Sequence, residues 1–403
     1  MTKKLLAGIV LLIALIAVTV KIELSSDKEA DGVTVITVWE SLNGPDKFIE
    51  AAGRAYEQDH PGIKIRFVNV ESGASASQIL LDGPAGVGPD LFAAPHDKLG
   101  ELINEGVITP IEDEEEVADK VITSCKTALT YNGRMYGYPV CGETYALFYN
   151  KELISEEELP KDWNELISWC KMFNSENKGK RGFVMSVGEG YYTIIFTTAN
   201  GNRLFGPTGT DTTSTYLNTY DAVVGMKVFQ NLREIYDVQA DDINGGNCDS
   251  EFAAGKAAMY ITGLWNVANF EERGIKFGVA PLPALPGTDT PSASFSGTRA
   301  MFVSEFSDHP KEAADFAKFL ISPEMQKLRF DITKVMPSIS VDVDSQYMEG
   351  FLKQLEYSFP MPSIPAMNSF WDVMNNASKN IWNGLDVENE LNTANSTILG
   401  NIN

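Results

Sequence analysis

The sequence predicts an α/β protein with two lobes, each built on a doubly wound sheet. Roughly 370 residues follow the N-terminal segment, more than one hydrophobic core usually serves, so two lobes are expected. Strands and helices alternate along most of this length. That order is typical of parallel sheets covered by helices on both faces.

The first lobe begins with a β-α-β-α-β order. The β-branched run Val33–Trp39 predicts a strand, and Asp46–Asp59 has apolar residues at helical spacing. Ile63–Val70 predicts a second strand, Ser75–Leu81 a short helix and Asp90–Ala94 a third strand. Three strands joined by helices predict a parallel arrangement in this lobe.

Doubly wound sheets bind ligands beyond the carboxyl ends of their strands. In this chain that rule singles out Glu40–Gly44, Glu71–Gly73 and Ala94–Lys98. The last of these leads into a helix expected over His96–Glu105.

The rest of the chain forms a second lobe and then returns to the first. Tyr131–Pro139 has the Asn-Gly turn chemistry of a hairpin, and Glu143–Asn150 predicts the next strand. Leu282–Ser296 is rich in Pro, Ser and Thr and predicts a loop, which leads to a return strand over Thr298–Ser304. Helices are expected over Pro310–Ile321 and Met367–Gly384.

This order divides the chain into three parts. Residues 1–32 form an export signal or a membrane tether. The first lobe takes residues 33–141 and 298–346, and the second takes residues 142–297 and 347–403.

The N-terminus has the pattern of an export segment. Lys3 and Lys4 precede the charge-free run Leu5–Val20, which is sixteen residues long. As a helix this run would measure about 24 Å, slightly short of a bilayer core of roughly 30 Å. Ala17-Val18-Thr19 is a poor cleavage site, so a removed signal and an uncleaved tether both stay open. Either one places the body outside the cytoplasm, secreted or at the cell surface.

The acidic balance excludes two classes of partner. The chain has 55 acidic and 32 basic residues and a formal net charge of −23. It therefore repels nucleic acid and anionic lipid.

Motifs for nucleophilic, metal and nucleotide chemistry are missing from the sequence. His60, His96 and His309 are too far apart for zinc spacing, there is no G-x-S-x-G, and Gly83–Gly88 lacks the Lys-Ser/Thr of a phosphate loop. No cofactor, no metal and no enzymatic activity are expected. Too few cysteines are present for a disulfide scaffold, and buried free thiols are favoured over a single bridge. The four are Cys125, Cys141, Cys170 and Cys248.

Four blocks of sequence carry a family resemblance. They are Pro89–Gly100, Tyr131–Ile154, Phe252–Trp265 and Met361–Trp371. In this order they resemble the extracytoplasmic solute-binding proteins of ABC importers, and most of all the sugar-binding branch that includes maltose/maltodextrin-binding protein. The resemblance spans about Val33–Leu391. It implies a type II periplasmic-binding fold, in which two lobes joined by several crossovers close on a ligand in a central cleft.

A sugar site needs carboxylates or amides that accept from hydroxyls, and flat aromatic faces for the C–H surface. By resemblance, Asp97 matches the acid after the third strand, and Glu143 matches the acid at the hinge side of the cleft. Lys98 matches a basic position that is arginine in the family member, so the bidentate fork is lost. Glu189 matches an acid that contacts sugar.

The same resemblance supplies the aromatic faces. Tyr191 matches a stacking aromatic, and Trp265 and Trp371 match two platforms of the second lobe. At three further matched positions this sequence departs from the family pattern. Ala94 replaces a tryptophan, Val267 a second indole and Asn375 an arginine, so a different or shorter ligand stays open.

Each assignment has a structural alternative. Asp97 could cap the free N–H groups of a nearby helix N-terminus. Of Tyr191 and Tyr192, one is expected to face the core and the other the cleft. Ligand contact is favoured for Trp265 and Trp371 because both stand at the ends of elements. The other tryptophans lie in apolar patterns and are expected in the core: Trp39, Trp163, Trp169 and Trp382.

The expected function is a monomeric receptor, not an enzyme. It would capture an oligosaccharide of the maltose/maltodextrin type and deliver it to the permease subunits of an ABC importer. Two kinds of alternative stay open. One is a secreted glycoside hydrolase, which would need two carboxylates either about 5–5.5 Å or roughly 6.5–9.5 Å apart. The other is a receptor for a different solute. A different sugar or polyol would fit the matched positions, whereas a phosphate ester would need an arginine cluster that they do not offer.

Overall fold

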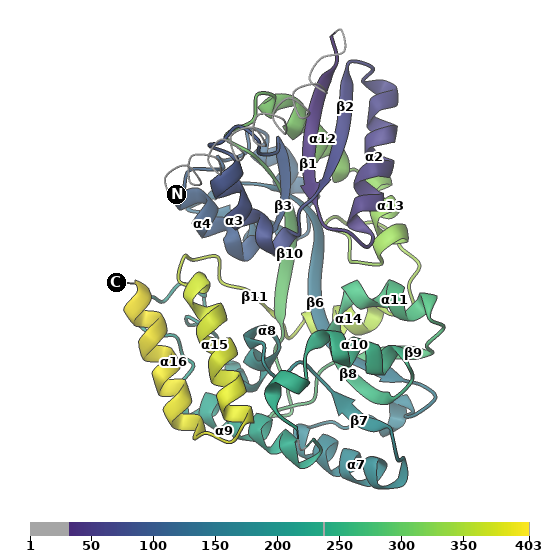
Figure 1. Cartoon of the computed structure of the whole chain (residues 1–403), viewed down its shortest axis with the longest axis vertical. Coiled ribbons are helices and arrows are strands. Elements are labelled where there is room, and N and C mark those ends of the chain that lie inside the picture. Colours follow the sequence, from purple (N-terminus) through teal and green to yellow (C-terminus); the bar gives the residue numbers. More distant parts are fainter. Residues whose placement is uncertain (1–31, 237, 403) are drawn as a thin grey trace, which may run out of the picture.

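The computed structural model describes residues 32–236 and 238–402, which fold into two lobes stacked along the long axis (Figure 1). One cluster of buried hydrophobic side chains joins residues between 36 and 140 to residues between 300 and 339. A second cluster joins residues between 141 and 295 to residues between 335 and 398. Each core is therefore assembled from segments that are distant in sequence.

The predicted export segment lies outside the described residues, apart from Gly32. Within the described part of the chain, no helix is both long and apolar enough to cross a membrane.

The first lobe follows the predicted order closely. Its elements are β1 (Thr34–Glu40), α2 (Pro45–Asp59), β2 (Ile63–Asn69), α3 (Ser72–Asp82) and β3 (Leu91–Pro95). Strand β1 lies between β2 and β3 and is parallel to both. The carboxyl ends of these strands therefore meet at one edge of the lobe, which faces the second lobe (Figure 1).

The helix predicted over His96–Glu105 begins differently. Residues His96–Lys98 form a single 3-10 turn, and α4 (Leu99–Asn104) follows it. The predicted hairpin is present as β4 (Thr130–Tyr131) paired with β5 (Arg134–Met135). The short helices α5 (Glu114–Lys120) and α6 (Thr123–Ala128) precede it.

Two long strands connect the lobes. Strand β6 (Tyr138–Asn150) begins five residues before the predicted strand, and β10 (Phe295–Val303) begins inside the segment predicted as a loop. Strand β10 pairs with β6 and with β3, antiparallel to both. Both strands pass from one lobe to the other (Figure 1). One sheet with the order β2-β1-β3-β10-β6-β8-β7 therefore runs through the whole molecule.

The sheet is consequently mixed. It is parallel where sequence order predicts it, among β1, β2 and β3, and antiparallel where β10 runs between β3 and β6. The reason is the direction of the chain, because β10 returns from the second lobe while β6 leaves the first.

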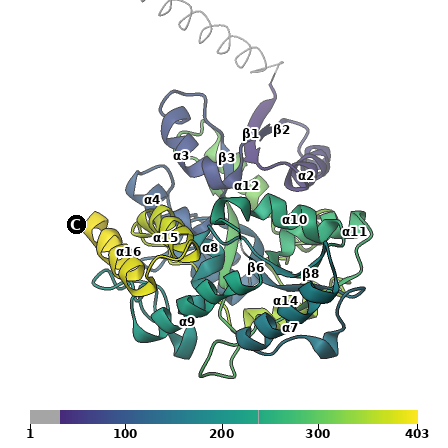
Figure 2. The ribbon, with the colours of Figure 1, turned by 60° about the horizontal axis from the view of Figure 1, so that its bottom comes forward.

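The second lobe extends the sheet with β8 (Ala257–Gly263), which pairs with β6 and β7 (Arg181–Val184). Strand β9 (Phe277–Ala280) also pairs with β6. Helices α15 (Met367–Trp382) and α16 (Val387–Ile402) lie side by side next to α9 (Tyr220–Asn231) (Figure 2). The remaining α-helices and strands of the described residues are α7 (Trp163–Glu176), α8 (Gly190–Thr193), α10 (Gly245–Ala253), α11 (Val267–Glu272), α12 (Pro310–Leu320), α13 (Pro323–Thr333), α14 (Met348–Leu355) and β11 (Phe359–Pro360).

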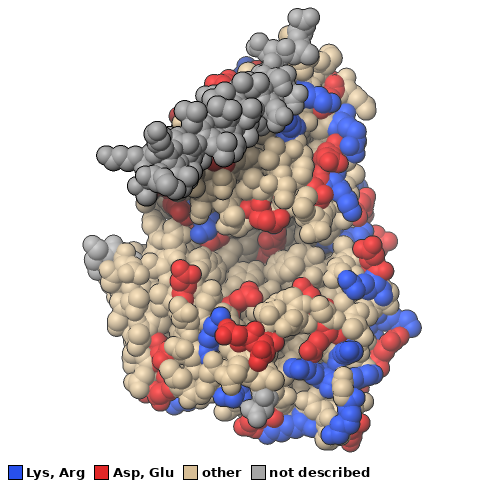
Figure 3. Space-filling view, in the orientation of Figure 1, with Lys and Arg blue, Asp and Glu red and all other residues tan. Residues whose placement is uncertain are grey.

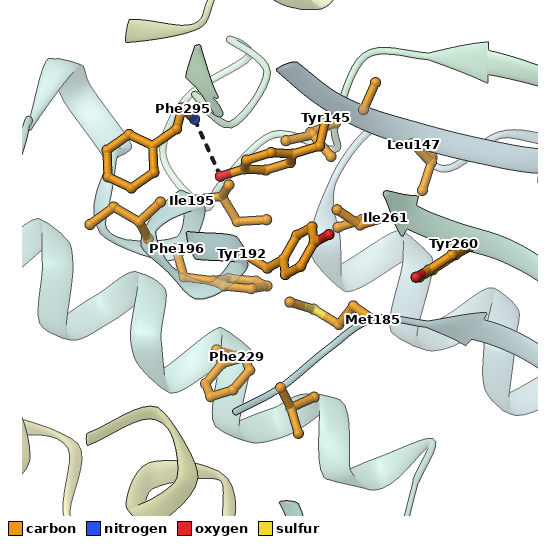
Figure 4. Packing of buried hydrophobic residues seen from close by; sticks show 14 of the residues in the cluster. Tyr145, Leu147, Met185, Tyr192, Ile195, Phe196, Phe229, Tyr260, Ile261 and Phe295 are labelled. Carbon is orange, nitrogen blue, oxygen red and sulfur yellow. Dashed lines mark hydrogen bonds between the residues drawn. The ribbon is translucent and has the colours of Figure 1, made fainter. Parts of the chain in front are cut away.

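Aromatic side chains fill the second core where it approaches the first lobe. The Tyr145 hydroxyl accepts a hydrogen bond of 3.2 Å from the Phe295 N–H (Figure 4) and donates one of 2.7 Å to the Tyr191 carbonyl. Three tryptophans predicted as core are buried, as expected: Trp39, Trp163 and Trp382. Trp169 is only partly buried and stacks on Phe173 at 4.9 Å. All four cysteines are buried free thiols.

Candidate functional site

The candidate site lies where the two lobes meet. Figure 3 shows the surface hollowed between them, with acidic side chains along the hollow. Strands β1 and β3 end there, and β6 and β10 pass through the same level (Figure 1). This position agrees with the rule that ligands bind beyond the carboxyl ends of parallel strands.

The three predicted aromatic residues lie together. The ring centroid of Tyr191, on α8, is 6.2 Å from that of Trp265 and 6.4 Å from that of Trp371. Tyr191 is half-buried, whereas Tyr192 is buried in the core. We call Tyr191, Trp265 and Trp371 the aromatic trio.

Trp265 is held by the turn that follows β8. Its side chain is 38% exposed and packs over Gly263, where a Cβ atom would lie 2.1 Å from the indole ring. The next residue, Asn266, donates hydrogen bonds to Asp249 at 2.6 Å and to Thr262 at 2.8 Å. The absence of a side chain at Gly263 and the anchored Asn266 together fix the direction of the indole.

Trp371 lies on the second turn of α15. Its ring packs against Phe370 at 5.0 Å and Phe295 at 6.1 Å. Its side chain also lies near the carboxyl group of Asp97 in the first lobe and contributes to lowering the pKa of that group. Trp371 thus links an aromatic face to a carboxylate from the opposite lobe.

Asp97 lies in the 3-10 turn after β3 and is buried. Burial raises the pKa of its carboxyl group, and the neighbouring His96, Lys98 and Trp371 oppose that shift. A buried carboxyl group needs hydrogen-bond partners, and ligand hydroxyls would supply them.

His96 is also buried and ties three segments together. Its Nδ1 accepts a 3.1 Å hydrogen bond from the Thr298 N–H, so its Nε2 donates the 2.9 Å bond to the Met361 carbonyl. Burial lowers the pKa of this imidazole, and the nearby charges of Asp97 and Glu143 oppose that effect. The ring is therefore neutral, with its proton on Nε2.

Glu143 lies on β6 opposite Gly297 of β10. One carboxylate oxygen, Oε1, accepts from the Cys141 thiol at 3.5 Å and lies 3.7 Å from Arg299 Nε. The negative charges of Glu143 and Asp97 contribute to raising the pKa of Tyr191, after burial and the neighbouring tyrosines. Both carboxylates therefore influence the pKa of one member of the aromatic trio, Tyr191.

The two remaining predicted residues lie at the margins. Lys98 donates to Asn368 of α15 at 3.0 Å and lies 3.8 Å from Glu101. Glu189 accepts a 2.6 Å hydrogen bond from the Ser186 hydroxyl. It borders a separate hollow of about 410 Å³ in the second lobe, whose other polar lining includes Asn244 and Asp372.

The three departures from the family pattern are placed clearly. Ala94 and Val267 are buried in the two cores, so neither offers a face to a ligand. Asn375 accepts a 2.6 Å hydrogen bond from the N–H of Gly190, at the start of α8. It therefore supports the short helix that presents Tyr191.

Sequence reasoning missed a buried group of charges beside the site. Glu40, at the end of β1, is fully buried and lies 2.9 Å from Arg299 Nη1 and 3.9 Å from Arg329 Nη1. Glu40 belongs to Glu40–Gly44, one of the segments singled out at the strand ends. Arg299 is a charged residue inside an apolar strand, and this pattern could have indicated a buried ion pair. The sequence around Arg329, on α13, gave no such indication.

No group of acidic, histidine and cysteine side chains in the described residues is arranged to hold a metal ion.

The comparisons with known proteins agree with this geometry. The family model for bacterial extracellular solute-binding proteins matches residues 39–327. A galactooligosaccharide-binding protein of Bacillus subtilis is 29% identical over 94% of this chain and 92% of its own length. A maltooligosaccharide ABC transporter solute-binding lipoprotein of Streptococcus pneumoniae is 27% identical over 87% of this chain and 86% of its own length.

A solved structure shares the whole architecture. The maltotriose-binding protein of Thermus thermophilus, bound to maltotriose, aligns with a TM-score of 0.82 and 25% identity over 91% of this chain and all of its own. With a family model that covers most of its length, a two-lobed fold and an aromatic and acidic site between the lobes, this chain belongs to the bacterial extracellular solute-binding proteins.

Proposed function

We propose that this protein captures a neutral oligosaccharide of the maltose/maltodextrin type between its lobes and delivers it to an ABC importer. The observation that carries the proposal is the aromatic trio with carboxylates beside it. Tyr191 lies within 6.2–6.4 Å of two tryptophan rings, and one of them, Trp371, lies near the Asp97 carboxyl group and contributes to lowering its pKa. Stacking rings beside hydrogen-bond acceptors fit the two faces of a sugar.

The proposed ligand-binding residues are Asp97, Lys98, Glu143, Glu189, Tyr191, Trp265 and Trp371. The trio would stack on the sugar rings. Asp97 and Glu143 would accept from hydroxyl groups, and Lys98 would donate at the first-lobe rim. Glu189, at the 410 Å³ hollow, would contact the far end of a longer ligand.

The wider role extends this binding proposal. The protein acts as a monomer and docks on permease subunits, and its N-terminal segment serves as export signal or tether. Residues 33–141 with 298–346 move as one body and residues 142–297 with 347–403 as the other, which the two separate cores support. A solute-binding role outside the cell fits the family, and the Streptococcus pneumoniae relative is a lipoprotein.

A panel of sugars tests the proposal. Melting temperature is measured with and without maltose, maltotriose, maltotetraose and a galactooligosaccharide, and every sugar that raises it is titrated by calorimetry. We expect the linear maltodextrins to stabilise the protein. Stabilisation by the galactooligosaccharide alone would favour the second candidate, to which the Bacillus subtilis relative points. No stabilisation by any sugar would contradict the function itself.

The same samples address hydrolysis. Release of reducing ends from maltotriose is followed over a day at high protein concentration. We expect none above the buffer control, because the site is proposed to bind its ligand without cleaving it.

A further inference from the structure

We propose that Arg299 is a further residue of the ligand site, where it positions the Glu143 carboxylate to accept a hydrogen bond from a sugar hydroxyl. This inference rests on the proposed function, which assigns Glu143 to the ligand. It concerns a residue that is not among the site residues predicted above.

Arg299 reaches two carboxylates from one strand. Its Nη1 lies 2.9 Å from Glu40 Oε1, and its Nε lies 3.7 Å from Glu143 Oε1. Strand register explains the reach, because Arg299 is opposite Cys141 and Gly297 is opposite Glu143, which puts Arg299 diagonal to Glu143. The planar guanidinium group presents donors in fixed directions, so it can hold both carboxylates at once.

Glu40 serves Arg299 and is unavailable to a ligand. Its side chain has no exposed surface, and its Oε1 also accepts from the Ser41 N–H at 2.8 Å. Its second oxygen faces Arg329 Nη1 at 3.9 Å. A buried charge is costly unless it is paired. Two glutamates and two arginines leave this network without net charge, and Glu40 anchors Arg299 inside it.

Glu143 differs from Glu40 in being partly exposed, since the second oxygen of Glu40 is buried and has no hydrogen-bond partner among the described residues. The Oε1 of Glu143 is engaged by Arg299 and by the Cys141 thiol, while its Oε2 makes no hydrogen bond with the described residues. Its side chain is 20% exposed and that of Arg299 is 18% exposed, so both are partly accessible to a ligand. Because Arg299 and the Cys141 thiol hold Oε1 in place, the carboxylate keeps one orientation, in which Oε2 is left for the ligand. Fixing an acceptor beforehand reduces the entropy that binding must overcome.

The rival explanation is a network that only stabilises the fold. A double-mutant cycle separates the two. The full chain is compared as wild type, Arg299→Lys, Glu143→Gln and the double variant, with maltotriose as the titrant and melting temperature recorded for each. Lysine keeps the charge but cannot serve both carboxylates. Arg134→Lys is the matched control, because Arg134 pairs with Glu114 at the surface of the first lobe.

We expect Arg299→Lys to weaken binding about tenfold when Glu143 is present, and by less than about twofold in the Glu143→Gln background. Arg134→Lys should leave affinity unchanged. If Arg299→Lys does not fold, Glu40→Gln replaces it in the cycle with the same expected coupling. Equal losses in both backgrounds would overturn the inference. Failure of the wild type to bind any sugar of the panel would instead contradict the proposed function.

Discussion

Trp265 and Trp371 differ in how much of the fold depends on them. Trp265 is 38% exposed and sits at a turn, so its removal leaves the core of the second lobe intact. Trp371 is half-buried and packs against Phe370 and Phe295. Both present an aromatic face beside Tyr191, and we therefore expect truncation of either to act mainly on ligand binding.

We expect Trp265→Ala and Trp371→Ala each to weaken binding of the panel sugar by about thirtyfold, or roughly 2 kcal/mol, since a stacking aromatic is a typical anchor. Calorimetric titration measures this loss, and thermal melting checks the fold. Trp169→Ala is the control, because Trp169 stacks on Phe173 in α7, away from the trio. Unchanged affinity in the first two variants would mean that these tryptophans were misassigned.

A single methyl group at Gly263 should have a similar effect without touching the ligand. A Cβ there would lie 2.1 Å from the Trp265 ring, so the indole must move. We expect Gly263→Ala to lower affinity about tenfold, or ~1.4 kcal/mol, with a shift in the tryptophan fluorescence. Gly62→Ala serves as the control, because a Cβ at Gly62 meets no atom within 4 Å. Normal affinity and fluorescence would show that Trp265 has room to adjust.

At the level of elements, the site depends on how the end of β3, strand β10 and the segment before α15 are joined. His96 joins these three segments, because its ring accepts a hydrogen bond from Thr298 and donates one to Met361. Because both ring nitrogens are used and one of them accepts, a proton on Nδ1 would break the bond to Thr298. The lowered pKa of His96 follows from this burial.

The junction should make stability depend on pH. The folded protein holds His96 neutral, while the unfolded chain takes up a proton below about pH 6.5, so the stabilisation is complete above that pH and declines as the pH falls below it. The raised pKa of Asp97 acts in the opposite sense, because the folded state keeps that proton better than the unfolded chain. Comparison with the His96→Gln variant isolates the contribution of the imidazole to this pH dependence, since the glutamine side chain can both accept and donate a hydrogen bond.

We expect the unfolding free energy of the wild type, from urea titrations at pH 7.5 and 5.5, to fall more than that of His96→Gln. Equal pH dependence in the two proteins would show that His96 is not the responsible group.

The elements also show what the sequence predicts and what it does not. The bounds of β1, α2 and β2 follow from local apolar periodicity, and each lies within one residue of its expectation. The ends of β6 and β10 do not follow from local periodicity, because these two strands pair with each other although a long insertion separates them in sequence. The aromatic and acidic candidates were proposed from the family resemblance. Arg299 and Arg329 were not predicted, because the pairing of charges between distant segments cannot be read from local sequence, although a charged residue in the apolar strand of Arg299 was a signal.

At the scale of the whole molecule, two cores are joined by strands that pass through a narrow middle (Figure 1). A ligand that contacts Asp97 from one lobe and the aromatic trio from the other favours whichever arrangement brings the lobes closest. Such a ligand shifts the population toward that closed form in proportion to its better contacts there.

Small-angle scattering with and without a saturating panel sugar should therefore show a smaller radius of gyration with the sugar, and a molecular mass of one chain in both samples. The Trp371→Ala variant, measured at the same sugar concentration, should compact less. An unchanged radius at demonstrated saturation would contradict closure, and a doubled mass would contradict the monomer.

Strand β10 also has a consequence for the order of synthesis. It occupies the centre of the sheet, and its Val303 pairs with Leu91 of β3. The first lobe therefore cannot complete its sheet until the whole insertion that forms most of the second lobe has been made. Pairings between such distant residues are slow to form, because loop closure must come before the contacts that reward it. During most of its translation, a chain of this design therefore lacks the central strand of its sheet.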